Sequence, residues 1–177
     1  MEDTVPQSNR KIYIKTGDNG TTVINGQRVP KYNCSIDAQG EIDELNCWIG
    51  AIISNFATNV VLMNVQYRLM DMGAQLATGK IRLKPEHIVE LEEEIDRMEQ
   101  TLPPLKNFIL PISPSTIHIT RAVCRRAERV VAAWREKYSS PENFTLVLPY
   151  LNRLSDFLFV LARYKAEEAE IKWKGKQ

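Results

Sequence analysis

Hydrophobic residues recur at spacings of three and four from about residue 35 onward, which is the period of an amphipathic α-helix. Five such segments are separated by short turns or by proline-rich breaks. We expect helices at about 35–56, 59–77, 85–102, 114–138 and 142–170. Pro149 lies inside the last segment and is expected to kink it or to mark a short first turn. Long helices joined by short loops predict the all-α class, as a five-helix antiparallel bundle.

The first 34 residues lack this helical period and are expected to be irregular, apart from a short extended segment at 12–14. Residues 15–22, with the sequence KTGDNGTT, are dense in turn formers, and Asn25 with Gly26 gives a second turn signal. Such a loop can present backbone N–H groups to phosphate oxygens, with Lys15 as a point charge. A surface hairpin is the alternative, and the composition of the loop alone favours it. The segment matches neither the Walker A nor the GxGxxG pattern.

The composition is that of a single soluble domain of 177 residues, of which 44% are hydrophobic and 25% charged. We divide it into an N-terminal loop region (1–34), the helical bundle (35–170) and a tail (171–177), of which residues 172–177 are expected to fray. The 23 Lys and Arg against 22 Asp and Glu give a formal charge of +1. That balance argues against nonspecific binding to nucleic acid or to a membrane surface. No apolar run approaches the roughly 20 residues that span a bilayer.

The three cysteines are too few and too scattered for a disulfide framework, so we expect buried thiols in a reducing compartment. Residues 1–10 resemble neither a secretory signal nor an Arg-rich transit peptide, which predicts a cytoplasmic protein. His87 is expected to be exposed at a helix start. The chain shows no Ser–His–Asp or Cys–His arrangement and no His/Cys cluster that could hold a transition metal.

The fourth predicted helix carries the most informative polar pattern. At helical spacing, one face holds His118, Arg121, Arg125, Glu128 and Arg129. The opposite face is expected to be core, with Ile119, Val123, Ala127, Val130 and Trp134. With Arg126, four arginines fall within nine residues and repel one another unless something anionic neutralises them. Acids on neighbouring helices are one explanation, and a bound phosphate is the other, because guanidinium groups match phosphate geometry. His118 is interpreted as a supporting group near this face.

Two other helices carry polar groups that could complete a site. Asn152 and Asp156 lie one turn apart on the fifth helix, beside its apolar stripe. Asp43, on the first helix, is expected to pair with an arginine of the fourth helix. A purely structural network between helices is the alternative explanation for these groups.

Several segments, taken in order, are similar to the PduO-type corrinoid adenosyltransferases, the ATP:cob(I)alamin adenosyltransferase family. The matching segments are KIYIKTGDNGTT (11–22), GEIDELN (40–46), FILP (108–111), Arg121 with RRAER (125–129), and LNRLSD (151–156) through ARY (162–164). Each segment alone is a weak or moderate signal. Together and in register they are specific, and they span nearly the whole chain.

The resemblance implies a five-helix homotrimer with active sites at the subunit interfaces. The enzyme would transfer the 5′-deoxyadenosyl group of ATP to the cobalt of cob(I)alamin and release triphosphate. The N-terminal loop would wrap the triphosphate and Mg²⁺ through Lys15, Thr16, Gly17, Asp18, Gly20 and Thr21, joined by Lys31. Arg125, Glu128, Arg129 and Asn152 would hold the nucleotide. Arg121 would pair with Asp43, and Phe108 would sit against the corrin and displace its lower axial ligand. Partners would include a flavin reductase and an adenosylcobalamin-dependent enzyme.

The chemistry agrees with the absence of an obvious protein nucleophile, since cob(I)alamin is itself a strong nucleophile. The protein would supply positioning and charge stabilisation. Two other functions share this sequence pattern: an adenosylcobalamin carrier with little turnover, and a structural oligomer whose arginines form interface ion pairs. The chain departs from the family pattern at Ile112 and Ser113, which replace a usual Gly-Gly pair, and at Gln39 and Asp37, which replace a usual aromatic and Glu. Its C-terminal tail is also short.

Overall fold

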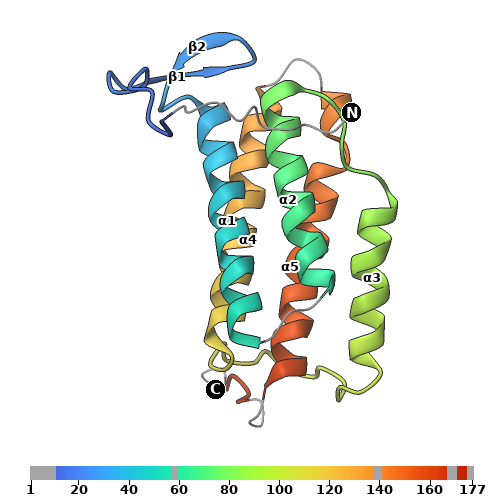
Figure 1. The fold of residues 1–177 in the computed structure, drawn as a ribbon. Coiled ribbons are helices and arrows are strands. Elements are labelled where there is room, and N and C mark those ends of the chain that lie inside the picture. The colour runs from blue at the N-terminus through green and yellow to red at the C-terminus, as the bar shows by residue number, and fades with distance from the viewer. Residues whose placement is uncertain (1–10, 57–59, 138–140, 167–170, 175–177) are drawn as a thin grey trace.

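The computed structural model describes residues 11–56, 60–137, 141–166 and 171–174. The predicted all-α bundle is confirmed (Figure 1). Its helices are α1 (Cys34–Phe56), α2 (Val60–Thr78), α3 (Glu86–Glu99), α4 (Ser115–Glu136) and α5 (Val147–Lys165). A short 3₁₀ turn, η1 (Pro141–Phe144), precedes α5, and a two-stranded hairpin, β1 (Thr21–Ile24) with β2 (Gln27–Pro30), precedes α1.

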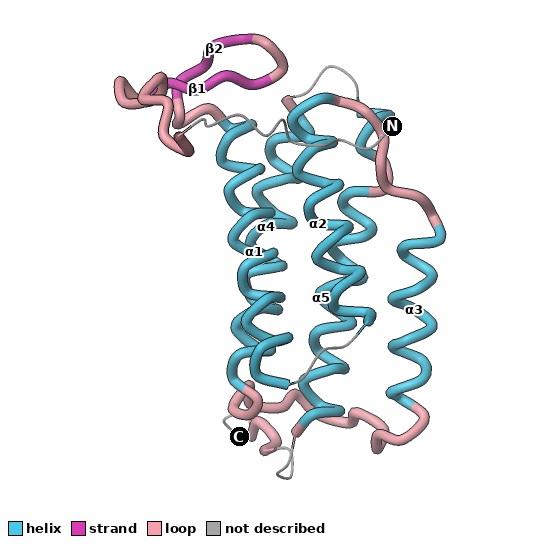
Figure 2. The backbone as a smooth tube through the Cα atoms, in the orientation of Figure 1, coloured by secondary structure: helices cyan, strands magenta, loops and turns pink. Residues whose placement is uncertain are grey.

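The helices form a layered bundle in which α1 packs against α2 and α4, α4 packs against α5, and α3 covers α5 (Figure 2). Each helix buries a stripe of apolar side chains at spacings of three and four, such as Leu62, Val65, Leu69, Met72 and Leu76 of α2. The buried Trp134 ring meets Phe144 edge-on at 4.8 Å, and its Nε1 donates to Ser35 Oγ. This contact places the end of α4 beside the start of α1.

Two predicted helix boundaries need correction. The third helix ends at Glu99 rather than near Leu102. The fifth begins at Val147, because residues 141–144 form the separate 3₁₀ turn. Pro149 was expected either to kink this helix or to mark a short first turn, and the second outcome is the one found. Pro149 then lies in the first turn of α5, where a missing N–H costs no helical hydrogen bond. The α5 helix ends at Lys165, and residues 167–170 lie outside the described residues.

The buried face of α4 agrees with the prediction at Val123, Ala127 and Trp134 but differs near the start of the helix. His118 is buried, with 7% of its surface exposed, whereas Ile119, predicted to be core, is 45% exposed. The stripe that reaches the core contains Ile117, Thr120, Cys124, Ala127, Val131 and Trp134. Its polar or small members weaken the hydrophobic signal, and the Thr120 hydroxyl is satisfied by donating to the Thr116 carbonyl.

The N-terminal region contains a hairpin where the sequence analysis expected irregular structure. Asn25 and Gly26 both have positive φ, of 49° and 74°, and they join strands whose register pairs Val23 with Arg28. Two consecutive positive φ values at an Asn-Gly pair are typical of a tight turn that matches the twist of antiparallel strands. Residues 12–14 do not form a strand.

The C-terminal segment is also more ordered than expected. Residues 171–174 run antiparallel to residues 108–110, with a bridge between Ile109 and Lys172. Leu110 N donates to the Ile171 carbonyl at 2.9 Å, and Trp173 N donates to the Phe108 carbonyl at 2.8 Å. The prediction of a frayed tail is therefore wrong for residues 172–174.

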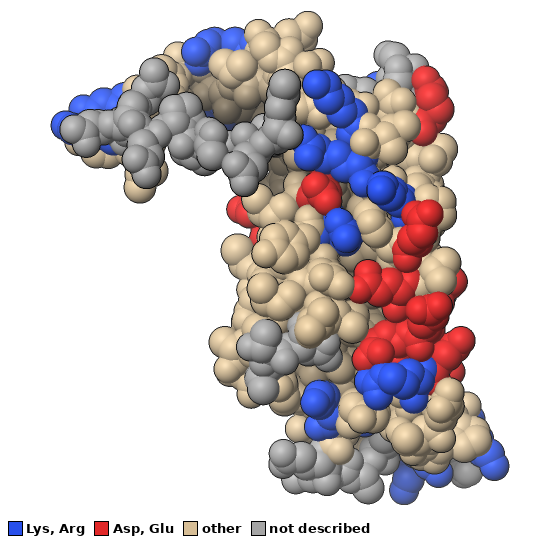
Figure 3. Space-filling model, turned by 45° about the vertical axis from the view of Figure 1, so that its right-hand side comes forward, with Lys and Arg blue, Asp and Glu red and all other residues tan. Residues whose placement is uncertain are grey.

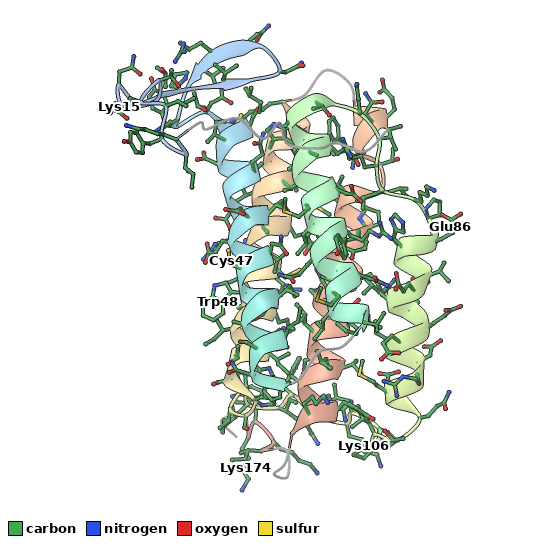
Figure 4. All side chains as sticks on the ribbon, viewed as in Figure 1. Lys15, Cys47, Trp48, Glu86, Lys106 and Lys174 are labelled. Carbon is green, nitrogen blue, oxygen red and sulfur yellow. The ribbon has the colours of Figure 1, made fainter. Side chains whose placement is uncertain are left out.

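Two further expectations concern the burial of the cysteines and of His87. Cys124 is buried as expected, but Cys34 is half-buried and Cys47 is exposed on α1 (Figure 4), so the prediction of three buried thiols is only partly correct. His87 is half-buried rather than exposed. The segment 142–165 is apolar enough by length and composition to cross a membrane, yet 56% of that window is buried in the bundle, as expected for a core helix.

Candidate active site

The N-terminal loop is a compact turn closed by its own backbone. Asp18 N donates to the Lys15 carbonyl and Gly20 N to the Gly17 carbonyl, at 3.4 and 3.1 Å. Lys15 and Gly20 adopt positive φ, of 60° and 79°. At Gly17, an added β-carbon would lie 3.1 Å from the Thr21 carbonyl oxygen and 3.4 Å from Lys31 Nζ. A side chain at position 17 would crowd the Thr21 carbonyl, and Lys31 lies beside the loop. The role of Lys31 toward a triphosphate stays a prediction.

Arg28 is a loop-supporting residue that the sequence analysis missed. Its Nη1 donates to the Thr16 carbonyl at 3.1 Å and to Thr21 Oγ1 at 2.9 Å. It therefore ties the hairpin to both ends of the glycine-containing turn. The signal for it was present, since the two-residue turn at Asn25 and Gly26 fixes the strand register and places Arg28 beside the loop.

The face formed by α4 and α5 brings together most of the other predicted residues. Asn152 Nδ2 donates to Glu128 Oε1 at 3.2 Å across the two helices. Arg129 Nη1 donates to the Arg125 carbonyl at 2.9 Å, one turn away on α4. Arg125, Arg129 and Asn152 are exposed, so their polar groups are accessible to a ligand.

The four arginines of α4 differ in how they are neutralised. Arg126 points toward α1, where its Nε donates to Glu41 at 2.8 Å and its Nη2 pairs with Glu44. The other three, which we call the arginine row (Arg121, Arg125 and Arg129), form no ion pair with any carboxylate among the described residues. Neutralisation by neighbouring acids therefore accounts for Arg126 only.

Acidic residues are plentiful elsewhere on the molecule but do not reach the arginine row. They gather in a band over α3 (Figure 3), a helix in which seven of fourteen residues are Asp or Glu. That band makes one ion pair to α5, between Glu92 and Arg153 at 2.9 Å. The acidic band of α3 therefore forms no ion pair with the row.

Arg121 lies at the partly buried end of the row. Its guanidinium carbon is 5.7 Å from the centre of the Phe159 ring, and its Nε is buried without a hydrogen-bond partner among the described residues. Burial, followed by the charge of Arg125, lowers the pKa of Arg121. Burial, followed by the charge of Arg121, also lowers the pKa of His118, whose Nδ1 lacks a partner there too. This end of the row favours a negative group that the described part of one chain does not supply.

Asp43 faces a different surface. It lines a hollow of about 430 Å³ between α1 and α2, together with Gly40, Gly73 and the exposed Met70. Gln39 Nε2 and Asn46 Oδ1, from the same lining, are buried with no partner among the described residues. Asp43 and Arg121 form no ion pair within one chain, so their pairing stays a prediction about contacts between chains.

Phe108 lies in the loop between α3 and α4 and is 79% exposed. The Trp173 ring meets it edge-on, with ring centres 6.3 Å apart and planes at 78°. A large exposed aromatic residue among exposed Leu105, Leu110 and Ile112 is typical of a binding surface.

These pieces are distributed along the length of the bundle. Figure 4 shows Lys15 at one end, and Lys106 and Lys174, which flank the Phe108 surface, at the other. The arginine row lies between them on α4. The described residues of the loop make no hydrogen bond or ion pair to the row. One chain therefore carries each part of the predicted site but does not close it.

The fold and these surfaces define a class: a helical-bundle protein with an exposed glycine-containing loop, a row of arginines without carboxylate partners among the described residues, and an exposed aromatic surface. The sequence model described as cobalamin adenosyltransferase matches residues 12–165. The chain belongs to this family, and the resemblance seen in the sequence is confirmed.

Characterised relatives agree. The corrinoid adenosyltransferase MMAB of Mus musculus is 40% identical over 180 residues, which cover 88% of this chain and 73% of the relative. The corrinoid adenosyltransferase of Bacillus subtilis is 39% identical, covering 86% and 85%. A phenylalanine-to-alanine variant of the PduO-type ATP:corrinoid adenosyltransferase of Lactobacillus reuteri, solved with cobalamin and ATP, superposes with a TM-score of 0.82 at 34% identity, covering 93% of this chain and 100% of that one. An arginine-to-lysine variant solved with ATP gives 0.81 at 34%, covering 92% and 100%.

Proposed function

We propose that Mg·ATP binds between the N-terminal loop of one subunit and the α4–α5 face of another, with the corrin against Phe108. The reaction is that of the family: the enzyme transfers the 5′-deoxyadenosyl group of ATP to the cobalt of cob(I)alamin, giving adenosylcobalamin and triphosphate. The observation that carries the proposed site is the arginine row, which the fold exposes without neutralising it.

The chemistry needs no protein nucleophile. The Co(I) electron pair attacks C5′ of the ribose, a Co–C bond forms, and the C5′–O bond breaks with its electron pair leaving on triphosphate. The protein must hold C5′ in line with cobalt, which is catalysis by positioning. In this proposal, Asn152 and Glu128 orient the nucleoside part, and their mutual hydrogen bond presets their geometry.

The leaving triphosphate gains negative charge as the bond breaks. Lys15 and Lys31, from the loop, and Arg125 and Arg129, from the row, would stabilise that charge. Arg28 would act indirectly, by holding the loop in shape through Thr16 and Thr21.

Mg²⁺ is proposed on the basis of donor chemistry. No group of three or more His, Cys, Asp or Glu side chains among the described residues could hold a metal ion. Mg²⁺ often takes phosphate oxygens, water and one or two carboxylates instead of an all-protein cage, and Asp18 of the loop would be the carboxylate. When bound, the ion neutralises part of the triphosphate charge.

The corrin is proposed to lie against Phe108. An apolar ring below the cobalt would exclude water and a lower axial donor, which makes reduction to Co(I) easier. A reductase, for which a flavin enzyme is the expected class, would supply the electron, and an adenosylcobalamin-dependent enzyme would use the product.

Assembly as a homotrimer would complete the site. The surface around Asp43 and the arginine row lie on different faces of one chain, so a contact between them joins unlike surfaces. Such contacts form a closed ring when the rotation between subunits closes, as it would in a trimer. Asp43 would neutralise Arg121 of a neighbouring subunit. The partnerless amides of Gln39 and Asn46 in the α1–α2 hollow support a contact there, because buried polar groups are normally hydrogen-bonded.

Cytoplasmic location is proposed on the basis of the three free cysteines, which suit a reducing compartment. The whole chain is treated as one domain, because the helices share one continuous core.

An adenosylcobalamin carrier with the same site is the other function that this geometry allows, but the family relationship favours the enzyme.

A turnover assay separates the enzyme from the carrier. The purified protein is mixed with Mg·ATP and chemically reduced cob(I)alamin, and both the Co–C bond and triphosphate are measured. We expect the two products in equal amounts over many turnovers. A single equivalent of adenosylcobalamin bound without continued triphosphate release would support the carrier and contradict turnover.

A further inference from the structure

The C-terminal segment 171–174, which we call the strap, holds one side of the Phe108 loop. Its two backbone hydrogen bonds, at 2.9 and 2.8 Å, flank the bridge between Ile109 and Lys172. This register places Trp173 directly beside Phe108 and brings their rings into edge contact. The strap is thus attached to the loop that carries Phe108.

Phe108 has little else to fix its ring. It is 79% exposed, and Trp173 provides the only ring contact to it among the described residues. An exposed aromatic side chain samples several rotamers, whereas one packed edge-on against a second ring has a preferred orientation. The edge contact with Trp173, at 78° between the ring planes, supplies that constraint, and most of the Phe108 side chain stays accessible.

A hollow of about 450 Å³ lies beside the two rings and is lined by Leu105, Lys106, Asn107, Phe108 and Trp173. Its apolar walls suit the edge of a flat ring system, and Lys106 and Asn107 can meet polar substituents. Because Trp173 forms one wall, its removal would widen the hollow as well as release Phe108.

We propose that Trp173 is a positioning residue for the adenosyl transfer: held by the strap, it fixes the Phe108 ring in the orientation that excludes the lower axial ligand of the corrin. This inference rests on the proposed placement of the corrin at Phe108. Trp173 acts through Phe108 and not on the nucleotide, so its loss should leave ATP binding unchanged.

The test compares Trp173→Ala, Trp173→Phe and the matched control Ile171→Ala, each in the full chain. Ile171 is 53% exposed and Trp173 57%, and Ile171 belongs to the same strap, so its replacement removes apolar surface without touching the ring pair. Three quantities are measured: kcat with cob(I)alamin, KM for ATP, and the fraction of bound cob(II)alamin that lacks an axial ligand, by electron paramagnetic resonance in the presence of Mg·ATP.

For Trp173→Ala we expect a smaller four-coordinate fraction, a kcat about tenfold lower and an unchanged KM for ATP, because only the corrin geometry is disturbed. Trp173→Phe should recover most of the four-coordinate fraction, and Ile171→Ala should match the wild type. A wild-type fraction and kcat in Trp173→Ala would overturn the inference. So would an equal loss in Ile171→Ala, since the strap would then act only as general support.

Phe108→Ala in the same assay separates this inference from the proposed function. If Phe108→Ala turns over like the wild type, the placement of the corrin at Phe108 is wrong. If Phe108→Ala is impaired and Trp173→Ala is not, only the role of Trp173 fails.

Discussion

Two sides of helix α4 carry the same residue type in different electrostatic settings. On the side that faces α1, Arg126 is paired with Glu41 and Glu44 of the same chain. On the side that faces α5, the arginine row has no carboxylate partner among the described residues, and the buried Nε of Arg121 has no acceptor. The first arrangement ties two helices together. The second leaves positive charge available to a ligand or another subunit.

The comparison shows how one sequence motif can hold both paired and unpaired charges. RRAER presents adjacent arginines, but the helical turn of about 100° per residue directs Arg125 and Arg126 to different neighbours. The neighbouring helix, and not the arginine itself, decides which role each has. The experiments below test this division, beginning with the largest expected effect.

Arg125→Ala should reduce kcat/KM about 10²- to 10³-fold, the usual cost of removing one group that stabilises developing negative charge. Arg126→Ala should keep near-normal kcat/KM and slightly lower the melting temperature, because it loses only exposed ion pairs to α1. Steady-state kinetics and thermal unfolding of both variants provide the measurement. Equal kinetic losses in the two variants would contradict the division.

Asn152→Ala should reduce kcat/KM roughly 10²-fold while leaving the fold intact, since Asn152 is exposed and its loss also frees Glu128 from its hydrogen bond. Asn55→Ala, at an exposed position near the end of α1, is the matched control and should be neutral. Near-normal turnover of Asn152→Ala would remove this residue from the proposed site.

Mg·ATP should raise the melting temperature of the wild type, since a ligand at 100 times its Kd stabilises the folded state by about 2.7 kcal/mol. The shift should persist in Arg126→Ala and shrink in both Arg125→Ala and Lys15→Ala. No shift in the wild type would instead support a structural oligomer whose arginines serve only interface contacts.

The smallest expected effect concerns pH. Burial lowers the pKa of His118 below its usual 6.5, so the unfolded chain binds a proton at a pH where the folded chain does not. Stability should therefore fall as the pH drops below 6.5, and His118→Gln should reduce that fall. His87→Gln is the comparison, because burial also lowers the pKa of His87. Unfolding curves at pH 7.5 and 5.5 that change equally in wild type and His118→Gln would contradict this.

The helices were predictable because their apolar residues repeat with the helical period over many turns. The burial of His118 and Thr120 on α4 was not, since polar residues give no hydrophobic signal and exposed Ile119 gave a stronger one. The hairpin followed from Asn25 and Gly26 but was obscured by the polar residues around them.

For the site, the helical period separated Arg126 from the face of the other three arginines, but it could not show that Arg126 alone is paired, because pairing with Glu41 and Glu44 depends on how α1 packs. The family resemblance supplied the candidate roles of the loop, Phe108 and Asn152. Contacts between distant segments, such as Trp173 with Phe108, have no local sequence signal. Pairing of Asp43 with Arg121 and the other assigned roles remain predictions.

The central claim is that one chain supplies the loop and another the arginine row, and subunit mixing tests it most directly. A loop variant (Lys15→Ala with Lys31→Ala) and a row variant (Arg125→Ala) are prepared separately and also co-expressed in equal amounts. If sites form between subunits, about a quarter of those in the mixed oligomers receive two intact halves, so activity should recover to about a quarter of the wild type. Activity that stays at the level of the separate variants would show that each site is built within one chain.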